Sequence, residues 1–333
     1  MKLIVPMAGR GTRLRPHTHV TPKPLLPVAG RTMVERIVET FAGALPRGFE
    51  EAVFVLGPDF GDGVRAQLTD IAGRFGIRAS FAVQETARGT AHAVAMAADA
   101  LDGEAVIVFA DTLFEMGTPD LDADAVVWTM TVEDPSRFGV AVHDAAGRIT
   151  EFVEKPATPI SREAIVGIYY VRDGATLRRE IDYLLENDVT GIGGEYQLTD
   201  ALDRMLKAGL TFKTASVDAW LDCGTIPALM KTSALVLAAD GQNVKLGTVA
   251  DDAVIVEPVF IGEGATVAGS VVGPNVSVEA GATVAGSVVR DSIVFGHATV
   301  EGSTLRDSLV GHHAAVRGVA GTLNIGDHAT AGA

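Results

Sequence analysis

The C-terminal part of the chain carries an imperfect hexapeptide repeat, and this repeat limits the fold more than any other feature. Aliphatic residues recur at spacings of five or six, at Ile261, Val267, Val272, Val278, Val284, Val289, Val294, Val300, Leu305, Val310 and Val316. Several hydrophobic residues precede a glycine, as in Val272-Gly273 and Val310-Gly311. One short strand per repeat would point one aliphatic side chain inward while small residues turn the corners. The pattern predicts a triangular parallel β-helix of about four coils; a sandwich rich in glycine and valine is the alternative.

The first part of the chain alternates between strand and helix patterns. Residues 2–6 form a short apolar run, which is followed by a loop rich in Gly and Arg and by a helical pattern from about Thr32. Further strands are expected at 52–56, 78–83, 105–109, 125–132, 138–143, 149–154 and 164–171, and helices at 62–74, 89–101, 174–186, 197–208 and 226–239. This alternation predicts parallel strands covered by helices, continued by a mixed sheet.

A chain of 333 residues favours more than one domain. We expect an α/β domain over 1–232, a helical linker over 233–250 and the β-helix over 251–333.

The charge of the chain indicates which ligands it can hold. A formal charge of -15 and a pI near 4.9 disfavour nucleic acid and anionic lipid as partners, so an anionic ligand should be small and locally bound. The first 36 residues nevertheless contain one acid, Glu35, against the bases Lys2, Arg10, Arg13, Arg15, Lys23, Arg31 and Arg36. This basic segment predicts a site for a small anion.

The sequence gives no signal for export. Cys223 is the only cysteine, so the chain cannot form an intrachain disulfide. The apolar run that begins at Leu3 stops at Pro6, and a membrane span needs about 18 uninterrupted apolar residues, which do not occur. We therefore expect a cytoplasmic protein.

Residues 7–28, MAGRGTRLRPHTHVTPKPLLPV, are the strongest candidate for chemistry. A glycine-rich loop that leaves a buried strand exposes backbone N–H groups to phosphates, while Arg and Lys neutralise charge that moves onto a leaving pyrophosphate. The residues expected to do this are Gly9, Gly11, Arg13 and Lys23. The dinucleotide pattern fails because Leu14 replaces its third glycine, and the Gly-Lys-Ser/Thr of a P-loop is absent.

This segment resembles the signature of the sugar-phosphate nucleotidyltransferases, in its Gly-x-Gly-Thr-Arg-Leu loop and its Pro-Lys-Pro-Leu element. The resemblance covers nearly the whole chain and is closest to glucose-1-phosphate thymidylyltransferases that carry a C-terminal left-handed β-helix. It implies a Rossmann-like mixed-sheet nucleotidyltransferase domain followed by a hexapeptide-repeat left-handed parallel β-helix. The left hand follows from the resemblance alone, because crossovers are usually right-handed.

The resemblance also implies contacts with a nucleotide. Residues 84–94, QETARGTAHAV, resemble the base-recognition segment of the family, in which Gln84 would bond a pyrimidine edge. The implied nucleotide-binding residues are Ala8, Gly9, Gly11, Thr12, Gln84, Gly89 and Thr90, with Arg13 and Lys23 as the catalytic charges. His92 lies within an expected helix, and we interpret it as a packing residue rather than a catalyst.

Two acids are candidate ligands for magnesium. Asp111 ends the apolar run of AVIVFADTLF, at the carboxyl end of a strand where α/β sheets bind ligands. The resemblance makes it a metal ligand together with Asp222 of WLDCGT, in which Cys223 replaces the commoner Thr of the family's Trp-x-Asp-x-Gly-Thr element. The alternative for either acid alone is a turn cap. Mg²⁺ is the implied cofactor.

Other segments resemble the family's sugar-phosphate contacts. Gly139 of FGV would let a sugar approach the backbone, Glu154 of FVEKP would accept from its hydroxyls, and Lys155 would meet its phosphate as a point charge. An exposed ion pair is the alternative for Glu154 and Lys155. The resemblance adds Val166, Tyr169 and Trp220 to this sugar-phosphate site.

Two departures from the family pattern bear on the sugar. Gly193 stands where many thymidylyltransferases have Arg, which leaves one phosphate or sugar contact in doubt. Residues 165–167, Ile-Val-Gly, offer no side-chain amide, unlike N-acetylglucosamine uridylyltransferases, so an unacetylated hexose 1-phosphate is favoured.

The implied activity is transfer of a nucleotidyl group from dTTP or UTP to glucose 1-phosphate, which yields a nucleotide sugar and pyrophosphate. The sugar phosphate would attack the α-phosphorus in line, without a covalent enzyme intermediate, and we expect a homo-oligomer. A bifunctional enzyme that also transfers acetyl groups is one alternative, because hexapeptide β-helices also form acetyltransferases with a His base, and His297, His312 and His313 lie there. A non-catalytic relative that binds sugar nucleotide is the other.

Overall fold

The computed structural model describes residues 1–9, 11–19, 21–145, 147–156, 158–239 and 244–332. The chain divides into two compact units. The first consists of Met1–Gly9 and Glu35–Trp220, and the second of Arg10–Val34 and Leu221–Ala333. Arg10 of the basic segment and residues 240–243 of the expected linker lie outside the described residues. The domain boundaries proposed from the sequence stay a prediction.

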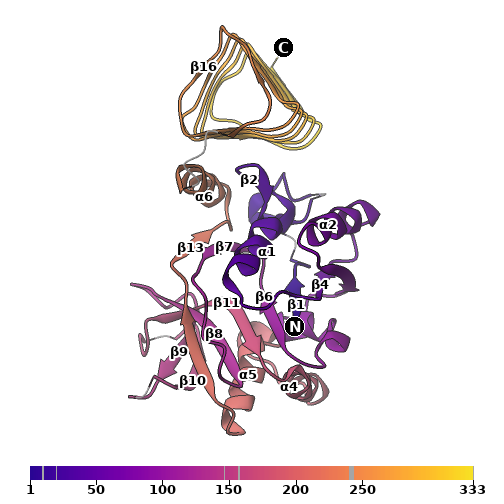
Figure 1. Ribbon diagram of the computed structural model, residues 1–333, viewed down its shortest axis with the longest axis vertical. Coiled ribbons are helices and arrows are strands. Elements are labelled where there is room, and N and C mark those ends of the chain that lie inside the picture. The colour runs from indigo at the N-terminus through magenta and orange to yellow at the C-terminus, as the bar shows by residue number, and fades with distance from the viewer. Residues whose placement is uncertain (10, 20, 146, 157, 240–243, 333) are drawn as a thin grey trace. The chain divides into compact units, whose positions relative to one another are not determined.

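The first unit contains a nine-stranded mixed sheet with the order β10-β9-β11-β6-β1-β4-β5 (Figure 1). Off this path, β8 pairs with β11, and β12 pairs with β8. Its strands are β1 (Lys2–Pro6), β4 (Glu51–Leu56), β5 (Arg78–Val83), β6 (Ala105–Val108), β8 (Ala125–Thr131), β9 (Gly139–His143), β10 (Ile149–Glu154), β11 (Glu163–Val171) and β12 (Phe212–Ser216). The neighbours β6, β1, β4 and β5 are parallel, whereas β11 runs antiparallel to β6, β8 and β9. The mixed α/β sheet expected from the sequence is confirmed.

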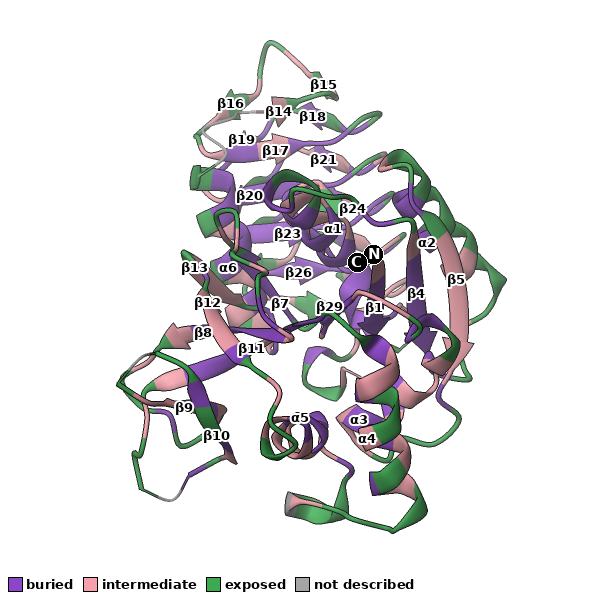
Figure 2. Ribbon diagram, turned by 60° about the horizontal axis from the view of Figure 1, so that its bottom comes forward, coloured by how far each residue is buried: buried purple, intermediate pink, exposed green. Residues whose placement is uncertain are grey.

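Helices pack on this sheet through their apolar faces. They are α1 (Met33–Ala44), which begins in the second unit, α2 (Asp62–Arg74), α3 (Thr90–Ala95), α4 (Gly174–Glu186) and α5 (Leu198–Lys207), with short 3₁₀ turns η3 (Ala98–Ala100) and η4 (Ile192–Gly194). In α5 the buried residues Leu198, Ala201, Leu202 and Met205 recur at helical spacing and join the main core. Figure 2 shows the central strands as the buried layer.

The structure differs from the expectations at several elements. A continuous helix over 89–101 is wrong, because α3 ends at Ala95 and the backbone of Ala97 (φ -101°, ψ 24°) leaves the helical region before η3 begins. Five strands outside the β-helix are not predicted by the sequence, namely β2 (Pro27–Val28), β3 (Arg31–Thr32), β7 (Thr112–Glu115), β12 and β13 (Ala219–Asp222).

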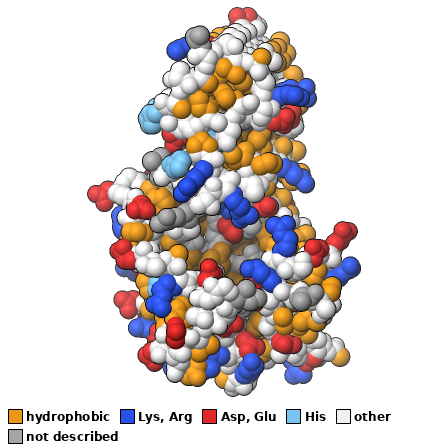
Figure 3. Space-filling view, turned by 180° about the vertical axis from the view of Figure 1, so that it is seen from behind, with side chains coloured by type: hydrophobic (Ala, Val, Ile, Leu, Met, Phe, Trp, Pro, Cys, Tyr) orange, Lys and Arg blue, Asp and Glu red, His pale blue; other side chains and the backbone are white. Residues whose placement is uncertain are grey.

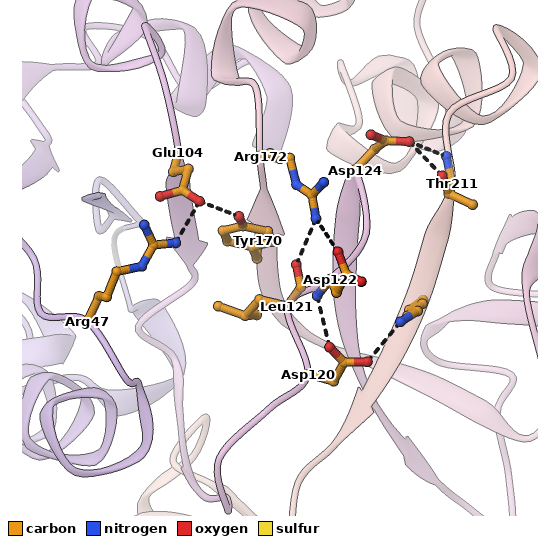
Figure 4. A network of polar contacts seen from close by, with 10 residues as sticks. Arg47, Glu104, Asp120, Leu121, Asp122, Asp124, Tyr170, Arg172 and Thr211 are labelled. Atoms are coloured by element: carbon orange, nitrogen blue, oxygen red, sulfur yellow. Dashed lines mark hydrogen bonds and ion pairs between the residues drawn. The ribbon is translucent and has the colours of Figure 1, made fainter.

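Polar contacts brace the edge of the sheet where β6 begins and β11 ends (Figure 4). Glu104 accepts from Tyr170 Oη at 2.8 Å and from Arg47 Nη2 at 2.8 Å. Burial acts to raise the pKa of the Glu104 carboxyl, but these hydrogen bonds outweigh it and the pKa is lowered. Asp124 holds the start of β12 by accepting from the Thr211 backbone N–H and hydroxyl at 2.8 and 2.7 Å. This edge is therefore fixed by its own side chains.

In the second unit, the repeat forms a parallel β-helix with three ladders of six, six and five strands (Figure 1). The first ladder is β14 (Val244–Lys245), β17 (Val259–Ile261), β20 (Val276–Val278), β23 (Ser292–Val294), β26 (Leu309–Val310) and β29 (Asn324–Ile325). The second is β15 (Thr248–Val249), β18 (Thr266–Ala268), β21 (Thr283–Ala285), β24 (Thr299–Glu301), β27 (Ala315–Arg317) and β30 (Thr330–Gly332). The third is β16 (Val254–Ile255), β19 (Val271–Val272), β22 (Val288–Arg290), β25 (Thr304–Arg306) and β28 (Ala320–Gly321). These ladders fit the left-handed β-helix that the repeat and the resemblance predict.

The β-helix is longer than the sequence predicts. Helix α6 (Ile226–Ala239) ends before the first short strand, β14, at Val244, and six strands in a ladder exceed the expected four coils. The extra coils were missed because their inward positions are only partly buried and irregular, as at Val249 and Ala331.

Stacked identical positions stabilise the coils. Val267, Val284, Val300 and Val316 lie in register and are buried in the core of the β-helix. Ser270 and Ser287 each accept from the backbone N–H of the serine one coil later, at 3.0 Å. At one corner His297, His313 and His328 occupy the left-handed region and stack with ring centroids 5.0 and 4.9 Å apart.

The described residues of segment 10–34 pack against the β-helix within the second unit. The segment contains η1 (Thr12–Leu14), η2 (Lys23–Leu25), β2 (Pro27–Val28) and β3 (Arg31–Thr32). Gly30 (φ 83°) approaches Phe260 so closely that an added Cβ would lie 2.3 Å from the ring, and its N–H donates to Glu279 Oε1 at 3.2 Å. His17 is 1% exposed, lies edge-on to Phe295 and meets Asn324 Oδ1 through Nε2. Contacts with the β-helix therefore help to hold segment 10–34 in place.

The surface of the β-helix retains outward apolar side chains. The exposed large ones are Leu246, Val254, Val256 and Val288. Figure 3 shows hydrophobic side chains gathered on this part of one face, with acids and bases interspersed elsewhere. Among the described residues, no helix has the length and apolar character needed to cross a membrane.

The buried histidines of the second unit predict loss of stability in mild acid. Burial lowers the pKa of His17, against the opposing effect of its bond to Asn324, and burial lowers the pKa of His312, against the opposing charge of Asp327. The unfolded chain, with a histidine pKa of about 6.5, then binds more protons than the folded chain. This stability is fully present above about pH 6.5 and is lost as the pH falls toward the lowered folded values.

We expect His17→Gln to reduce the fall in Tm between about pH 7.5 and about pH 5.5, because it removes one group that must bind a proton on unfolding. Thermal denaturation followed by circular dichroism measures this. The control is His19→Gln, at an exposed position two residues along the same loop. An equal fall in Tm for both variants and the unsubstituted protein would show that His17 is not responsible.

Candidate functional site

The parallel strands of the first unit end at one edge of the sheet, and candidate residues follow three of these ends. Ala8 and Gly9 come after β1, Gln84 after β5 and Asp111 after β6. The ladder continues past the strands, since Met7 N donates to Val55 O at 2.9 Å and Gln84 N to Leu56 O at 2.8 Å. The carboxyl edge of a parallel sheet is where α/β proteins bind ligands.

Gln84 is held in one orientation by its neighbours. Its side chain is 5% exposed, and its Nε2 lies 3.4 Å from Gly89 O and 2.9 Å from His92 Nδ1. Gly89 (φ 115°) must be glycine, because an added Cβ would collide with the backbone carbonyl oxygen of Tyr196. The sequence pattern indicates a packing role for His92 and does not reveal the hydrogen bond between its ring and Gln84.

The turn that carries Gly89 and Thr90 is tied to the segment before α5. Ala91 N donates to Tyr196 O at 2.9 Å, and Leu198 N donates to Thr90 Oγ1 at 2.8 Å. Arg88 adds a cation–π contact 4.9 Å from the centre of the Tyr196 ring. The segment QETARGTAHAV, recognised in the sequence, is therefore bonded to residues 193–200, GGEYQLTD, which lead into α5.

Gly139 and Glu154 face each other across the β9–β10 ladder. They are paired in register, and a Cβ on Gly139 would lie 2.8 Å from Glu154 Oε2. Lys155 Nζ is 3.6 Å from Glu154 Oε1, and its side chain is half exposed. The ion pair between Glu154 and Lys155, which the sequence offers as an alternative, is therefore present. It leaves the Lys155 ammonium accessible to an anion.

Tyr169 lies in β11, where the charges of two acids act on it. Burial raises the pKa of its hydroxyl strongly, and the charges of Glu154 and Asp111 raise it further. The phenol therefore stays neutral and can donate a hydrogen bond. Val166 is buried in the same strand, at the irregularity where the β11–β8 register shifts.

Aromatic rings complete this region. The Trp220 ring lies 5.0 Å from that of Phe138, and its Nε1 is buried with no acceptor among the residues that the structure describes. Phe109 lies edge-on to Tyr169 at 6.3 Å. The sequence assigns no role to Phe109 or Phe138, although they lie within the recognised motifs AVIVFADTLF and FGV.

The second unit holds the remaining candidates in a compact loop. Gly11 (φ 55°) accepts from the Thr18 hydroxyl through its carbonyl at 2.8 Å, and a Cβ there would lie 3.3 Å from Lys23 Cβ. Thr12 and Arg13 follow in η1, and Lys23, which is 8% exposed, begins η2. The loop is thereby closed on itself between Gly11 and Lys23.

Arg13 and Asp222 meet over Gly224. A Cβ built on Gly224 would lie 3.2 Å from Arg13 Nη2 and 2.9 Å from Asp222 Oδ1. Asp222 Oδ1 accepts from Gly224 N at 2.7 Å, and the Asp222 carbonyl accepts from Thr232 Oγ1 at 2.7 Å. Glycine is needed here because a side chain would fill the space beside both charges.

The predicted site residues thus fall into two sets. The first unit contains Ala8, Gly9, Gln84, Gly89, Thr90, Asp111, Gly139, Glu154, Lys155, Val166, Tyr169 and Trp220, and the second contains Gly11, Thr12, Arg13, Lys23 and Asp222. Within the described residues, no group of three or more His, Cys, Asp or Glu is arranged to hold a metal ion by itself.

Comparison with known proteins places this arrangement in a family. The model of the nucleotidyl transferase family matches residues 2–239. The low-salt glycan biosynthesis nucleotidyltransferase Agl11 of Haloferax volcanii is 31% identical over 274 residues, which are 80% of this chain and 74% of that protein. A glucose-1-phosphate thymidylyltransferase of Streptomyces antibioticus is 30% identical over 287 residues, covering 83% of this chain and 77% of the relative.

A solved structure agrees with the sequence comparisons. A Bacillus anthracis protein assigned as a glucose-1-phosphate thymidylyltransferase superposes with a TM-score of 0.58 at 27% identity, over 71% of this chain and 94% of that one. The family match spans the sheet, the glycine-rich loop and the segment around Asp222. The chain belongs to the nucleotidyl transferase family.

Proposed function

We propose that this protein transfers a nucleotidyl group from dTTP or UTP to glucose 1-phosphate and releases pyrophosphate. Family membership supports sugar-phosphate nucleotidyl transfer, and a related protein is named for glucose 1-phosphate and thymidylyl transfer. The observation that carries the proposal is the row of strand ends at which Gly9, Gln84 and Asp111 follow neighbouring parts of one parallel sheet. A backbone loop, a base-reading amide and a carboxylate are what a bound nucleoside triphosphate needs.

The choice of a hexose without an acetamido group rests on the sugar side of the first unit. Glu154 offers a carboxylate opposite Gly139, where the absence of a side chain leaves room for Glu154 Oε2. Tyr169 and Trp220 add donors, and Lys155 adds a positive charge. Residues 165–167, Ile-Val-Gly, offer no side-chain amide for an N-acetyl group, so glucose 1-phosphate is the acceptor that we favour.

The chemistry proposed needs positioning and charge rather than a protein nucleophile. A phosphate oxygen of the sugar phosphate forms a bond to the α-phosphorus, and the bond from that phosphorus to the pyrophosphate oxygen breaks. Arg13 and Lys23 would stabilise the negative charge that collects on pyrophosphate. Thr12 and the backbone of Gly11 would hold the triphosphate chain.

Asp111 and Asp222 are the magnesium ligands that we propose. Both side chains are exposed carboxylates, and Mg²⁺ is commonly bound by one or two carboxylates together with substrate phosphates. Asp222 Oδ1 is already bonded to Gly224 N, so the residue is oriented before an ion arrives. Bound there, magnesium would screen the repulsion between the two phosphate groups.

Acetyl transfer is not proposed for the β-helix. His297 and His313 stack on each other with their planes 8° apart, and His312 lies against Phe295. The stacked rings continue to His328 as a corner ladder, which explains their recurrence by packing alone. Association of copies through the β-helix stays a prediction.

One prediction of this proposal concerns substrates. With magnesium present, pyrophosphate release should be greatest for dTTP or UTP with glucose 1-phosphate, when ATP, GTP and CTP and the 1-phosphates of mannose, galactose and N-acetylglucosamine are tested beside them. A coupled pyrophosphate assay measures the rate of release for each pair of nucleoside triphosphate and sugar 1-phosphate. Greater release with N-acetylglucosamine 1-phosphate would contradict the choice of sugar. The absence of pyrophosphate release with every substrate pair would contradict the proposed reaction.

A second prediction concerns Arg13. Arg13→Ala should lower kcat by about 100- to 1000-fold, the usual cost of removing one preorganised donor that stabilises transition-state charge. Steady-state kinetics with the best substrate pair measures it. The matched control is Arg290→Ala, an exposed arginine of the β-helix that pairs with Asp291. A loss of about tenfold or less would place Arg13 outside contact with the reacting phosphates.

A further inference from the structure

The amide of Gln84 has an orientation that its neighbours dictate. Of the hydrogen bonds that the described structure gives this side chain, both are made by Nε2, with Gly89 O at 3.4 Å and His92 Nδ1 at 2.9 Å. A backbone carbonyl can only accept, so the NH₂ group of Gln84 must face Gly89. The carbonyl oxygen Oε1 therefore points away from both neighbours.

This orientation fixes the state of His92. Since Gln84 Nε2 can only donate, His92 Nδ1 must accept, and the ring must be neutral with its hydrogen on Nε2. Burial lowers the pKa of His92, and the positive charge of Arg88 lowers it further. Both effects favour the neutral ring at neutral pH.

His92 is well placed to hold this position. It lies in α3, whose first turn is fixed by the bonds from Ala91 N to Tyr196 O and from Leu198 N to Thr90 Oγ1. Arg88, the charge acting on His92, is itself tied to Tyr196 through a hydrogen bond of 2.8 Å to its hydroxyl. The His92 ring and the Arg88 side chain are therefore both held by hydrogen bonds.

We propose that His92 is a positioning residue that sets base specificity by fixing which end of the Gln84 amide meets the base. With Nε2 committed to His92 and Gly89, Gln84 presents Oε1, an acceptor. An acceptor suits a base with a ring N–H, as in thymine and uracil at N3, and opposes cytosine, whose N3 carries a lone pair. This inference rests on the proposed function, in which Gln84 contacts the base.

The test compares uracil with cytosine in the full-length protein. His92→Leu removes the acceptor, so the Gln84 amide can turn, and the ratio of kcat/KM for UTP over CTP should fall by about tenfold, the worth of one ordinary hydrogen bond. His92→Asn places an acceptor oxygen where Nδ1 stood and should restore the ratio. His143→Leu, at the end of β9 in the same unit, is the control and should leave the ratio unchanged.

A pH profile adds a readout that a merely structural role would not move. Protonation of His92 turns Nδ1 into a donor, so the UTP over CTP ratio of the unsubstituted protein should fall as the pH drops below about 6.5 toward the lowered pKa. The ratio in His92→Asn should stay flat over the same range. This profile also serves if His92→Leu fails to fold.

The outcomes separate the two proposals. An unsubstituted protein that is inactive with every nucleotide contradicts the proposed function. An active protein that prefers UTP, and whose ratio is the same in His92→Leu and independent of pH, overturns the role of His92 while the proposed function stands. A ratio that falls in His92→Leu and in acid, and is restored and flat in His92→Asn, supports the role.

Discussion

The parallel pairing of β6, β1, β4 and β5 is the constraint on which the first unit depends. Parallel strands need crossovers that return to the same edge, so every strand ends on one side and every following loop begins there. For this reason Gly9, Gln84 and Asp111, which are far apart in the sequence, follow ends of the same set of strands. At the opposite edge, where these strands begin, residues such as Glu104 and Tyr170 form hydrogen bonds that stabilise the sheet. None of the candidate ligand-binding residues named above follows a strand end there.

A different constraint governs the loop that carries Arg13 and Lys23. Segment 10–34 has little regular structure of its own, and a loop of this kind must obtain its order from contacts elsewhere. Gly30 and His17 supply those contacts with coils of the β-helix, at Phe260 and Asn324. A repeat structure provides a stiff base because each coil packs on its neighbours. The β-helix thus contributes to the order of the glycine-rich loop, whatever else it does.

Local pattern was sufficient for most elements of the first unit. The helices over 62–74 and 174–186 and the strands over 78–83 and 149–154 have the bounds that the sequence predicts, because their apolar spacing and their flanking breakers are local. Strand β12 was missed because FKTAS has a single large apolar residue and forms only by pairing with β8. Tertiary pairing, rather than propensity, decides such a strand.

The site could be predicted only as far as its motifs extend. Gly9, Arg13, Lys23 and Asp222 were recognised from sequence, but the packing of the loop on the β-helix joins residues 307 positions apart, His17 and Asn324. No spacing rule reports a contact of that kind. Likewise the aromatic pair Phe138 and Trp220 depends on the approach of separate strands.

His92 shows why a packing interpretation and a functional one can both hold. A buried amide such as Gln84 has two chemically different ends, and an unmatched end costs about 1–3 kcal/mol, so its neighbours decide how it points. In the sequence His92 is one residue of an expected helix, and nothing distinguishes it from a residue that only packs. Its ring becomes informative only when the turn at Gly89 brings a carbonyl, an imidazole and an amide nitrogen together. A residue such as His92, which contacts the Gln84 amide and not the base, can then determine whether the amide selects a donor or an acceptor on the base.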